Sequence, residues 1–469
     1  MKNFIVTLIK SISGIRGTIG GKPGDGLTPL DAVKFASAYG MWIKSISTKK
    51  PLVLIGRDAR MSGEMIASLV ISTLNGLGIN VIDTGLSTTP TVEMAVVNHS
   101  ADGGIILTAS HNPKQWNALK LLNAKGEFIS DAEGKAILEM AEKEAFDYAL
   151  VDEMGTTKKV NTTLDEHIAA VLKLPYVDLE AIKSANFNIV IDAINSSGAF
   201  AVPQLLTALG VAKIQVIHGE MHGDFAHNPE PLPEHLTDLS HTVIKTKADL
   251  GISVDPDVDR LAMVCEDGTM FGEEYTLVSV ADCVLSYHKS GNTVSNLSST
   301  RALRDITEAM GGTYTAAAVG EVNVVTAMKA SKAVIGGEGN GGVILPELHY
   351  GRDALVGIAL FLSHLAKNKS TASALRRTYP NYVISKNKIE LTPAINVDEV
   401  LKKVKELYAN QPVNTVDGVK IEFGNEWVHL RKSNTEPIIR IYSESQSEEK
   451  ANALAKKIMA NIREAAGIV

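Results

Sequence analysis

Residues 51–85 read "PLVLIGRDARMSGEMIASLVISTLNGLGINVIDTG", and this stretch decides the fold class. An apolar run of strand length, "PLVLIG" (51–56), is followed by the helix-like "SGEMIASLVISTLNGLG" (62–78). A second apolar run, "INVIDTG" (79–85), comes directly after it. Strands that alternate with helical segments predict α/β layers with functional groups at the strand ends.

The same alternation continues along the chain. "FNIVIDAINSSGA" (187–199) precedes a helix-like segment and another apolar run, and residues 249–264 and 332–345 have a strand–loop–strand pattern. The last part differs: amphipathic helices at 394–410 and 447–465 flank alternating, antiparallel-type strands at 418–445. We therefore predict three related α/β domains with mixed sheets and a smaller α+β domain, with limits at 1–155, 156–264, 265–385 and 386–469. The last limit lies at the polar "SKNK" (385–388).

Composition excludes several classes of protein. The 469-residue chain carries a net charge of -7, so no general binding of nucleic acid is expected. Any bound phosphate should be held by a few placed cations. The two cysteines, Cys265 and Cys283, are too few for a disulfide framework. The amino-terminal "MKNFIVTLIK" is too short for a signal-peptide core and is predicted to be a strand. No apolar run reaches the length of a membrane span, so we expect no membrane partner and a cytoplasmic location.

A serine follows the apolar run 103–107, in "TASHNPKQWNALK" (108–120). A serine after a strand can cap a helix. Alternatively, the Ser110 hydroxyl acts as a nucleophile or phosphate carrier, with Lys120 available to move a proton.

Three aspartates stand at alternate positions in "SVDPDVDRLAMV": Asp255, Asp257 and Asp259, followed by Arg260. Carboxylates packed this closely repel one another unless a cation lies among them, and oxygen ligands suit Mg²⁺. An EF-hand is rejected because Arg260 occupies the place where that loop requires glycine. A solvated acidic turn is the alternative, although apolar runs flank the triplet on both sides.

Two further loops are polar. In "VIGGEGNGGVILPE", Asn340-Gly341 is typical of a hairpin turn, but Glu338 among glycines could hold sugar hydroxyls. In "RKSNTEPIIRIY", cations, hydroxyls and turn amides suit a phosphate, although a plain polar turn would look similar. The residues concerned are Arg431, Ser433, Asn434, Thr435 and Arg440. A Walker A loop and a GxGxxG dinucleotide motif are both missing, so a nucleoside triphosphate is not indicated.

Together these loops resemble the α-D-phosphohexomutase family nearly end to end. The resemblance lies in "SISGIRGT" (11–18), "GRDARMSG" (56–63), "TASHNPKQWNALK" (108–120), "HNPEPLPEHL" (227–236), "DPDVDR" (255–260), "GGEGNGG" (336–342) and "RKSNTEPIIRIY" (431–442). It implies four domains around a central cleft.

The resemblance also implies roles for single residues. Ser110 would carry the phosphoryl group, and Asp255, Asp257 and Asp259 would bind Mg²⁺ together with a phosphoserine oxygen. Arg16 and Lys120 would serve charge stabilisation and proton transfer, and Arg260 would sit beside the metal. Glu338 and Asn340 would face the sugar, and the loop at 431–442 would hold the phosphate that is not reacting. The implied reaction interconverts hexose 6-phosphate and hexose 1-phosphate through a hexose 1,6-bisphosphate.

The sugar loop departs from the "GE-x-SGH" of many bacterial relatives, because Asn340 and Gly342 replace its serine and histidine. An amide there, and Glu321 where some relatives carry histidine, favour an amino sugar, so we predict a phosphoglucosamine mutase with phosphoglucomutase/phosphomannomutase as the alternative. A metal-dependent sugar phosphatase and a non-enzymatic sugar-phosphate sensor are rival classes. The sequence leaves open whether the protein is a monomer or a dimer.

Overall fold

The computed structural model describes residues 6–11, 14–390, 395–432 and 438–467. The chain divides into two compact units. The first unit comprises residues 1–276 and 341–373, and the second comprises 277–340 and 374–469. Among the helices of the described ranges, none is both long enough and apolar enough to span a membrane.

A seven-stranded sheet opens the first unit, in the order β1-β2-β6-β5-β3-β4-β7. Its strands are β1 (Ile9–Ser11), β2 (Gly14–Thr18), β3 (Leu52–Arg57), β4 (Asn80–Leu86), β5 (Gly103–Leu107), β6 (Trp116–Asn123) and β7 (Thr157–Lys159). The strands predicted at 51–56 and 79–85 are confirmed. The predicted amino-terminal strand is wrong for residues 6–8, since β1 begins only at Ile9. Strand β7 lies beyond the predicted domain limit at 155 yet pairs with β4.

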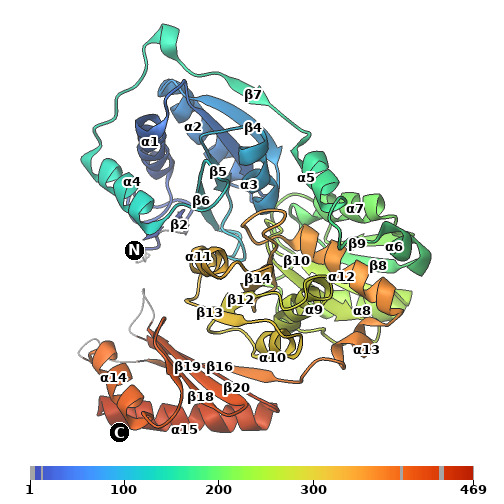
Figure 1. Ribbon diagram of the computed structural model, residues 1–469. Helices are drawn as coiled ribbons and strands as arrows, with labels where there is room; N and C mark the ends of the chain where they lie inside the picture. The colour runs from blue at the N-terminus through green and yellow to red at the C-terminus, as the bar shows by residue number, and fades with distance from the viewer. Residues whose placement is uncertain (1–5, 12–13, 391–394, 433–437, 468–469) are drawn as a thin grey trace. The chain divides into compact units, whose positions relative to one another are not determined.

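Helices cover both faces of this sheet (Figure 1). They are α1 (Pro29–Ile46), α2 (Gly63–Gly76), α3 (Thr89–Asn98) and α4 (Asp131–Lys143). Val53 and Ile55 pack with α1, α2 and α4 in one core, whereas Leu54 packs with α3 in another. Alternate residues of a strand point to opposite faces, so this apolar run supplies both cores.

A four-stranded sheet, β11-β10-β8-β9, follows in the first unit. Its strands are β8 (Asn188–Asp192), β9 (Lys213–Ile217), β10 (Leu250–Val254) and β11 (Leu261–Cys265). The helices of this region are α5 (Thr163–Val171), α6 (Leu179–Ala185), α7 (Gly198–Leu209) and α8 (Thr237–Thr246), with 3₁₀ turns η1 (Val151–Glu153) and η2 (Pro233–His235). Strand β15 (Gly342–Ile344) and α12 (Ala354–Asn368) complete the unit, and α12 packs on α5, α6 and α7.

The second unit contains three parallel strands in the order β13-β12-β14 and an antiparallel sheet in the order β16-β20-β19-β18-β17. The parallel part comprises β12 (Thr293–Asn296), β13 (Tyr314–Ala317), β14 (Ile335–Glu338), α10 (Ala302–Ala309) and α11 (Glu321–Ser331). The antiparallel part comprises β16 (Val383–Glu390), β17 (Val413–Asn414), β18 (Val419–Phe423), β19 (Glu426–Lys432), β20 (Ile438–Ser445), α14 (Val397–Leu407) and α15 (Glu448–Ala466). Helices α9 (Glu273–Leu285) and α13 (Ala372–Arg376) run across the limits between the units.

The predicted fold class is confirmed: α/β layers are followed by an α+β module whose two helices and three central strands fall where the sequence pattern placed them. One detail differs. The polar "SKNK" at 385–388 is part of strand β16, which pairs with β20 along its length. Polar residues are tolerated there because several of them face solvent at the edge of the antiparallel sheet.

Candidate functional site

Ser110 lies in the loop that joins β5 to β6. Its backbone has a φ of 48°, the left-handed conformation that residues other than glycine adopt only at a cost. The Ser110 amide donates to Thr108 Oγ1 at 3.0 Å, and its hydroxyl donates to Asp255 Oδ2 at 2.7 Å. No helix begins at Ser110, so the alternative of a helix cap is wrong for this serine. The strained turn instead presents the hydroxyl to the loop after β10.

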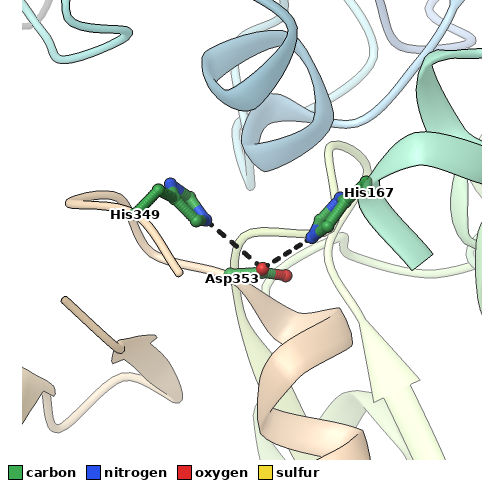
Figure 2. A group of neighbouring side chains, drawn as sticks. All are labelled: His167, His349 and Asp353. Atoms are coloured by element: carbon green, nitrogen blue, oxygen red, sulfur yellow. Dashed lines mark hydrogen bonds and ion pairs between the residues drawn. The ribbon is translucent and has the colours of Figure 1, made fainter. Parts of the chain in front are cut away.

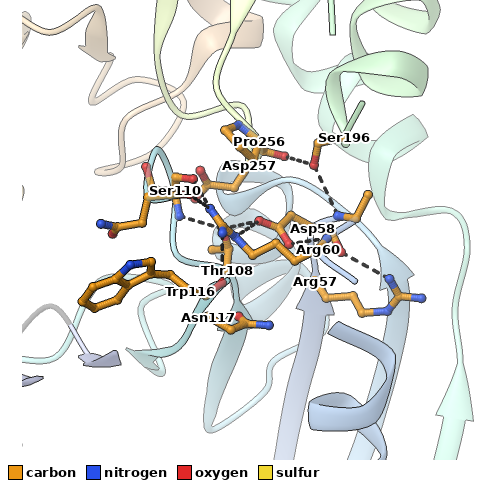
Figure 3. Close-up of polar contacts among 12 residues, drawn as sticks. Arg57, Asp58, Arg60, Thr108, Ser110, Trp116, Asn117, Ser196, Pro256 and Asp257 are labelled. Atoms are coloured by element: carbon orange, nitrogen blue, oxygen red, sulfur yellow. Dashed lines mark hydrogen bonds and ion pairs between the residues drawn. The ribbon is translucent and has the colours of Figure 1, made fainter. Parts of the chain in front are cut away.

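Arg60 holds this loop in place (Figure 3). Its guanidinium donates to Pro113 O and Trp116 O, each at 2.9 Å, and also to the carbonyls of Ser110 and Asn112. The remaining Nε–H donates to Asp58 Oδ2 at 3.0 Å. Arg60 is 1% exposed and Asp58 is fully buried. The Ser110 loop is therefore fastened by a charged pair in the protein interior.

The loop between β10 and β11 gathers the three aspartates. Asp255 Oδ1 accepts the backbone N–H groups of Asp259 and Arg260, both at 3.1 Å, which folds the loop back on itself. One ligand oxygen from each aspartate lies within 4.8 Å of the others, and all three residues are fully buried. Among the described residues, Asp257 Oδ1 and Asp259 Oδ1 accept no hydrogen bond. Buried carboxylate oxygens without donors fit a hard divalent cation.

Cations surround the aspartates. Lys120, on β6, lies with Nζ 2.7 Å from Asp257 Oδ2 and 3.5 Å from Asp259 Oδ2. Arg352 donates to Asp259 Oδ2 at 2.8 Å, and Arg260 Nε lies 3.9 Å from Asp259 Oδ1. Buried cations thus face the triplet from three separate segments of the first unit.

Arg16 approaches the serine loop from β2. It donates to Asn112 Oδ1 at 3.2 Å, and β2 pairs with β6, the strand that carries Lys120. Burial and the neighbouring Arg260 lower the pKa of Arg16. The positive charge is therefore concentrated enough for the cations to repel one another.

The pKa shifts show the same crowding of charge. Burial raises the pKa of Asp255, and the charges of Asp259 and Asp257 raise it further. Burial alone would raise the pKa of Asp259, but Arg352 and Lys120 outweigh burial and lower it. For Lys120, burial acts to lower the pKa, but Asp257 and Asp259 outweigh it, so the net shift is upward. In this arrangement the lysine keeps its proton.

His111 follows the serine, with Nδ1 3.4 Å from the Ser110 hydroxyl. Burial, followed by the charge of Arg260, lowers the pKa of His111 to about 2. A neutral imidazole therefore borders the serine at neutral pH.

Thr89, the first residue of α3, fixes the aspartate loop from the other side. Its amide donates to the Asp257 carbonyl at 2.8 Å, and its hydroxyl donates to Asp257 Oδ2 at 2.5 Å. Ser196 bridges Pro256 O and the amide of Ala59 (Figure 3). The loops after β3, β4, β5, β8 and β10 thus converge, as functional loops do at the carboxyl ends of parallel strands.

The predicted sugar-loop residues lie in the second unit. Glu338 ends β14, is 4% exposed, and accepts from Asn296 Nδ2 at 2.8 Å and from the Gly320 amide at 3.1 Å. Glu321 begins α11 directly after Gly320. Asn340 lies in the turn at 339–341, as the Asn-Gly pair predicts, and Gly341 has a φ of 85°. Acidic and amide groups therefore gather where β12, β13 and β14 end.

The predicted phosphate loop is partly described. Ser433, Asn434 and Thr435 lie outside the described residues. Arg431 on β19 stands opposite Arg440 on β20, and Arg440 stands opposite Lys388 on β16. Like charges directly opposite one another destabilise a sheet unless an anion lies among them. Asp417 Oδ2 partly supplies that charge, 2.8 Å from Arg431 Nε, and also accepts the Val319 amide at 3.0 Å.

Sequence reasoning assigned no role to several of these residues. Arg60 lies in the quoted "GRDARMSG", but nothing in that pattern shows that its partners are main-chain carbonyls 50 residues away. Arg352 lies just before helix α12 and Lys388 lies in strand β16, each next to other polar residues. Only the sheet register and the packing of α12 bring them to their sites.

The chain matches models of one protein family along most of its length. Four family models match in order: phosphoglucomutase/phosphomannomutase alpha/beta/alpha domains I (8–148), II (165–268) and III (272–382), and the C-terminal domain of the same family (390–461).

Curated relatives are similar along nearly the whole chain. A phosphoglucomutase/phosphomannomutase of Thermococcus kodakarensis is 36% identical over 93% of this chain and 95% of its own. A probable phosphoglucosamine mutase of Methanopyrus kandleri is 32% identical over 96% and 97%. A phosphoglucosamine/phosphogalactosamine mutase of Sulfurisphaera tokodaii is 32% identical over 95% and 97%.

A solved structure shows the same fold. It is a phosphoglucomutase/phosphomannomutase family protein of Burkholderia thailandensis, with a TM-score of 0.83, 23% identity, and coverage of 99% of this chain and 98% of its own. Because the four domain models match in sequence order and the relatives are similar over nearly their full length, this chain belongs to the phosphoglucomutase/phosphomannomutase family of α-D-phosphohexomutases.

Proposed function

We propose that the protein is a phosphohexomutase that interconverts the 6-phosphate and 1-phosphate of an amino sugar, glucosamine phosphate, through a phosphoserine at Ser110. The observation that carries this proposal is the 2.7 Å contact between the Ser110 hydroxyl and Asp255, inside a group of three buried aspartates. A sugar-phosphate sensor has no need of a strained, buried hydroxyl beside a metal-type triplet.

In the proposed reaction, phosphorylated Ser110 gives its phosphoryl group to the free hydroxyl of a sugar monophosphate. A bond forms between phosphorus and the sugar oxygen, the bond to Ser110 Oγ breaks, and the proton lost by the sugar hydroxyl is gained overall by Ser110 Oγ. The resulting hexose 1,6-bisphosphate returns its other phosphoryl group to Ser110, which releases the isomeric monophosphate. The hydrogen bonds from Arg60 to the Ser110 loop keep the serine oxygen in one position for both transfers. Positioning of the reacting groups contributes much of the rate of phosphoryl transfer.

Asp255, Asp257 and Asp259 are the residues that would hold Mg²⁺. When bound, the ion neutralises negative charge on the phosphoryl group as it moves. Arg16, Arg260 and Arg352 add positive charge to the same place from the protein. Lys120 is assigned to proton transfer and charge stabilisation. While Asp257 and Asp259 carry their negative charges, they raise the pKa of Lys120. The protonated lysine therefore acts first by stabilising negative charge.

The second unit supplies groups for the sugar and for the phosphate that does not react. Glu338 is oriented by Asn296 and by the Gly320 amide, and its carboxylate suits sugar hydroxyls. Arg431, Arg440 and Lys388 form a row across neighbouring strands, which suits a phosphate dianion.

The preference for an amino sugar rests on Asn340 and Glu321. An amide can meet an amine or a hydroxyl, and a carboxylate at residue 321 favours a protonated amine. Two relatives named for phosphoglucosamine support this assignment. The relative at 36% identity is named for glucose and mannose phosphates, which keeps these sugars as the second candidate.

Two measurements test the proposal. Mass spectrometry of the purified protein should find phosphate on Ser110, whereas a labile acyl phosphate on Asp255 would indicate a phosphatase. Glucosamine, glucose and mannose phosphates should then be assayed side by side, each with a trace of its bisphosphate. We expect the highest kcat/KM for glucosamine phosphate and loss of all turnover in Ser110→Ala. Undiminished turnover in Ser110→Ala would refute the phosphoserine mechanism, and a wide preference for glucose phosphate would refute only the sugar assignment.

A further inference from the structure

A second group of potential metal ligands lies in the first unit, separate from the aspartate triplet. It consists of His167 on α5, His349 in the loop before α12, and Asp353, which caps α12 (Figure 2). One ligand atom from each lies within 4.8 Å of the others. The side chains of His167 and Asp353 are fully buried. The proposed mutase reaction uses none of these three side chains.

The two imidazole rings point at the same carboxylate oxygen. His167 Nε2 lies 2.9 Å and His349 Nε2 3.3 Å from Asp353 Oδ2. In a tetrahedral zinc site with bonds of about 2.0–2.1 Å, ligand atoms lie about 3.3–3.4 Å apart. The separation of 3.3 Å matches that value and the separation of 2.9 Å is shorter, so an ion could enter if His167 and Asp353 moved slightly apart.

The opposite nitrogen of each ring is also held. His349 Nδ1 lies 3.3 Å from Glu93 Oε2, and His167 Nδ1 lies 2.9 Å from Thr91 Oγ1. A histidine that binds a metal through one nitrogen commonly donates the other N–H to a carboxylate or another acceptor, which fixes the ring. His167 has this arrangement through Thr91, whereas His349 Nδ1 makes an ion-pair contact with Glu93 rather than a well-aligned hydrogen bond. In both histidines Nε2 faces Asp353 and Nδ1 faces α3.

The third ligand is oriented in the same manner. Asp353 Oδ1 accepts the amides of Leu355 and Val356 at 2.8 and 3.3 Å, which leaves Oδ2 for the histidines. Gly351 passes so close to Glu93 that a side-chain Cβ there would overlap its carboxylate. The backbone is therefore shaped to bring His349 and Glu93 together.

The cluster requires positive charge. Glu93 and Asp353 are both buried, and burying carboxylates without a countercharge is costly. A divalent ion would supply two charges at the point where both rings converge.

We propose that His167 Nε2, His349 Nε2 and Asp353 Oδ2 bind one divalent transition-metal ion, preferentially Zn²⁺, with Glu93 and Thr91 holding the rings. Imidazole ligands select such an ion over Mg²⁺, which prefers oxygen. The site is structural, since it joins α3, α5 and the start of α12. Two of these segments also carry groups that reach the aspartate loop, Thr89 on α3 and Arg352 beside Asp353.

The test is metal titration of the full-length protein after removal of metals with a chelator. Excess MgCl₂ is present to occupy the aspartate triplet, and CoCl₂ is added while the visible absorbance is recorded. We expect one equivalent of Co²⁺ to give the strong bands of a four-coordinate site and one equivalent of ZnCl₂ to abolish them. His349→Gln and His167→Gln should each lose the bands. Asp257→Asn and the control His241→Gln, an exposed residue on α8, should keep them.

X-ray absorption of the cobalt-loaded wild type covers the case in which a variant does not fold, because it requires no substitution. A shell with two imidazole ligands supports the site if it persists in His227→Gln, because Asp192, His218 and His227 form another group with two imidazoles. An all-oxygen shell, the absence of stoichiometric binding by folded wild type, or unchanged bands in folded His349→Gln would each overturn the proposal. None of these results depends on mutase activity.

Discussion

Replacing Arg60 with methionine should release the loop that carries Ser110. The guanidinium donates to Asp58 and to four main-chain carbonyls between residues 110 and 116, and methionine can make none of these bonds. The change leaves Asp58 as a buried charge without its partner, which costs about 3–5 kcal/mol. That free energy corresponds to roughly two to four orders of magnitude in the local opening equilibrium.

Amide hydrogen exchange is the suitable assay, because a chain of several domains need not unfold in one step. Protection in a peptide covering residues 103–123 should fall by that factor in Arg60→Met, while a peptide from β19 and β20 in the second unit stays unchanged. Turnover should fall at least about a hundredfold, since misplacement of the serine oxygen by about 1 Å is enough.

Arg57 provides a matched control in the same segment (Figure 3). It is half-buried and donates to Asp58 O at 3.2 Å, so Arg57→Met should change local stability by no more than about 1 kcal/mol. Asp58→Asn combined with Arg60→Met should recover part of the lost protection, because it removes the unpaired charge. If Arg60→Met exchanged like Arg57→Met, the arginine would not fasten the loop and the reasoning would be refuted.

Three further predictions follow from charge. His218 and His227 both donate to Asp192, and their pKa values are raised, for His227 against the effect of burial. Their contribution to stability is therefore full below about pH 6.5 and is lost as pH rises through the folded-state pKa. His227→Gln should lower Tm more at pH 5.5 than at pH 8.5, and an equal loss at both would contradict this. Asp255→Asn keeps the oxygen that accepts the amides of Asp259 and Arg260, although its Nδ2 cannot accept the Ser110 hydroxyl, and it removes one of three crowded charges. Tm measured in EDTA should therefore rise while turnover falls at least about a hundredfold; a fall in Tm would show that carboxylate repulsion is unimportant. Arg440→Ala should raise KM for the sugar phosphate about 10- to 100-fold, and Lys388→Ala should raise it less; an unchanged KM in both would exclude the row as the phosphate site.

The fold class and the chemistry-bearing loops could be predicted because their signals are local in sequence. Strand β3 is an apolar run with a helix after it, and Asp255, Asp257 and Asp259 are spaced so closely that a cation is the simplest explanation. The serine after β5 is also a local signal, but the residues alone left a helix cap and a phosphate carrier open, and the resemblance to the family favoured the carrier.

Other parts of the site depend on contacts between distant segments. Arg60 binds carbonyl oxygens, which every residue has, so no side-chain pattern identifies its partners. Lys388 belongs to the polar "SKNK" that marked a predicted domain limit, and only its pairing with β20 puts it opposite Arg440. His167 and His349 are 182 positions apart by their residue numbers, and each alone is an ordinary histidine. Their convergence on Asp353 is a property of how α5 and α12 pack.

The charges around Ser110 suit a phosphoryl group that is bound together with a divalent cation. The three aspartates make ionic contacts with three cations, Lys120, Arg260 and Arg352, and Arg16 adds a further positive charge nearby, so the cations balance or slightly exceed the carboxylates. A phosphoryl group on Ser110 brings about two negative charges, and a divalent cation brings two positive ones. Either addition alone would leave buried charge uncompensated, whereas the two together keep the site close to neutral. Without the aspartates, the cations alone would bind a phosphate. With the aspartates present, a phosphate is balanced in charge only when a divalent cation is bound as well. The carboxylates make a lone phosphate a poor fit, so in the proposed reaction the site retains the phosphoryl group only together with the metal.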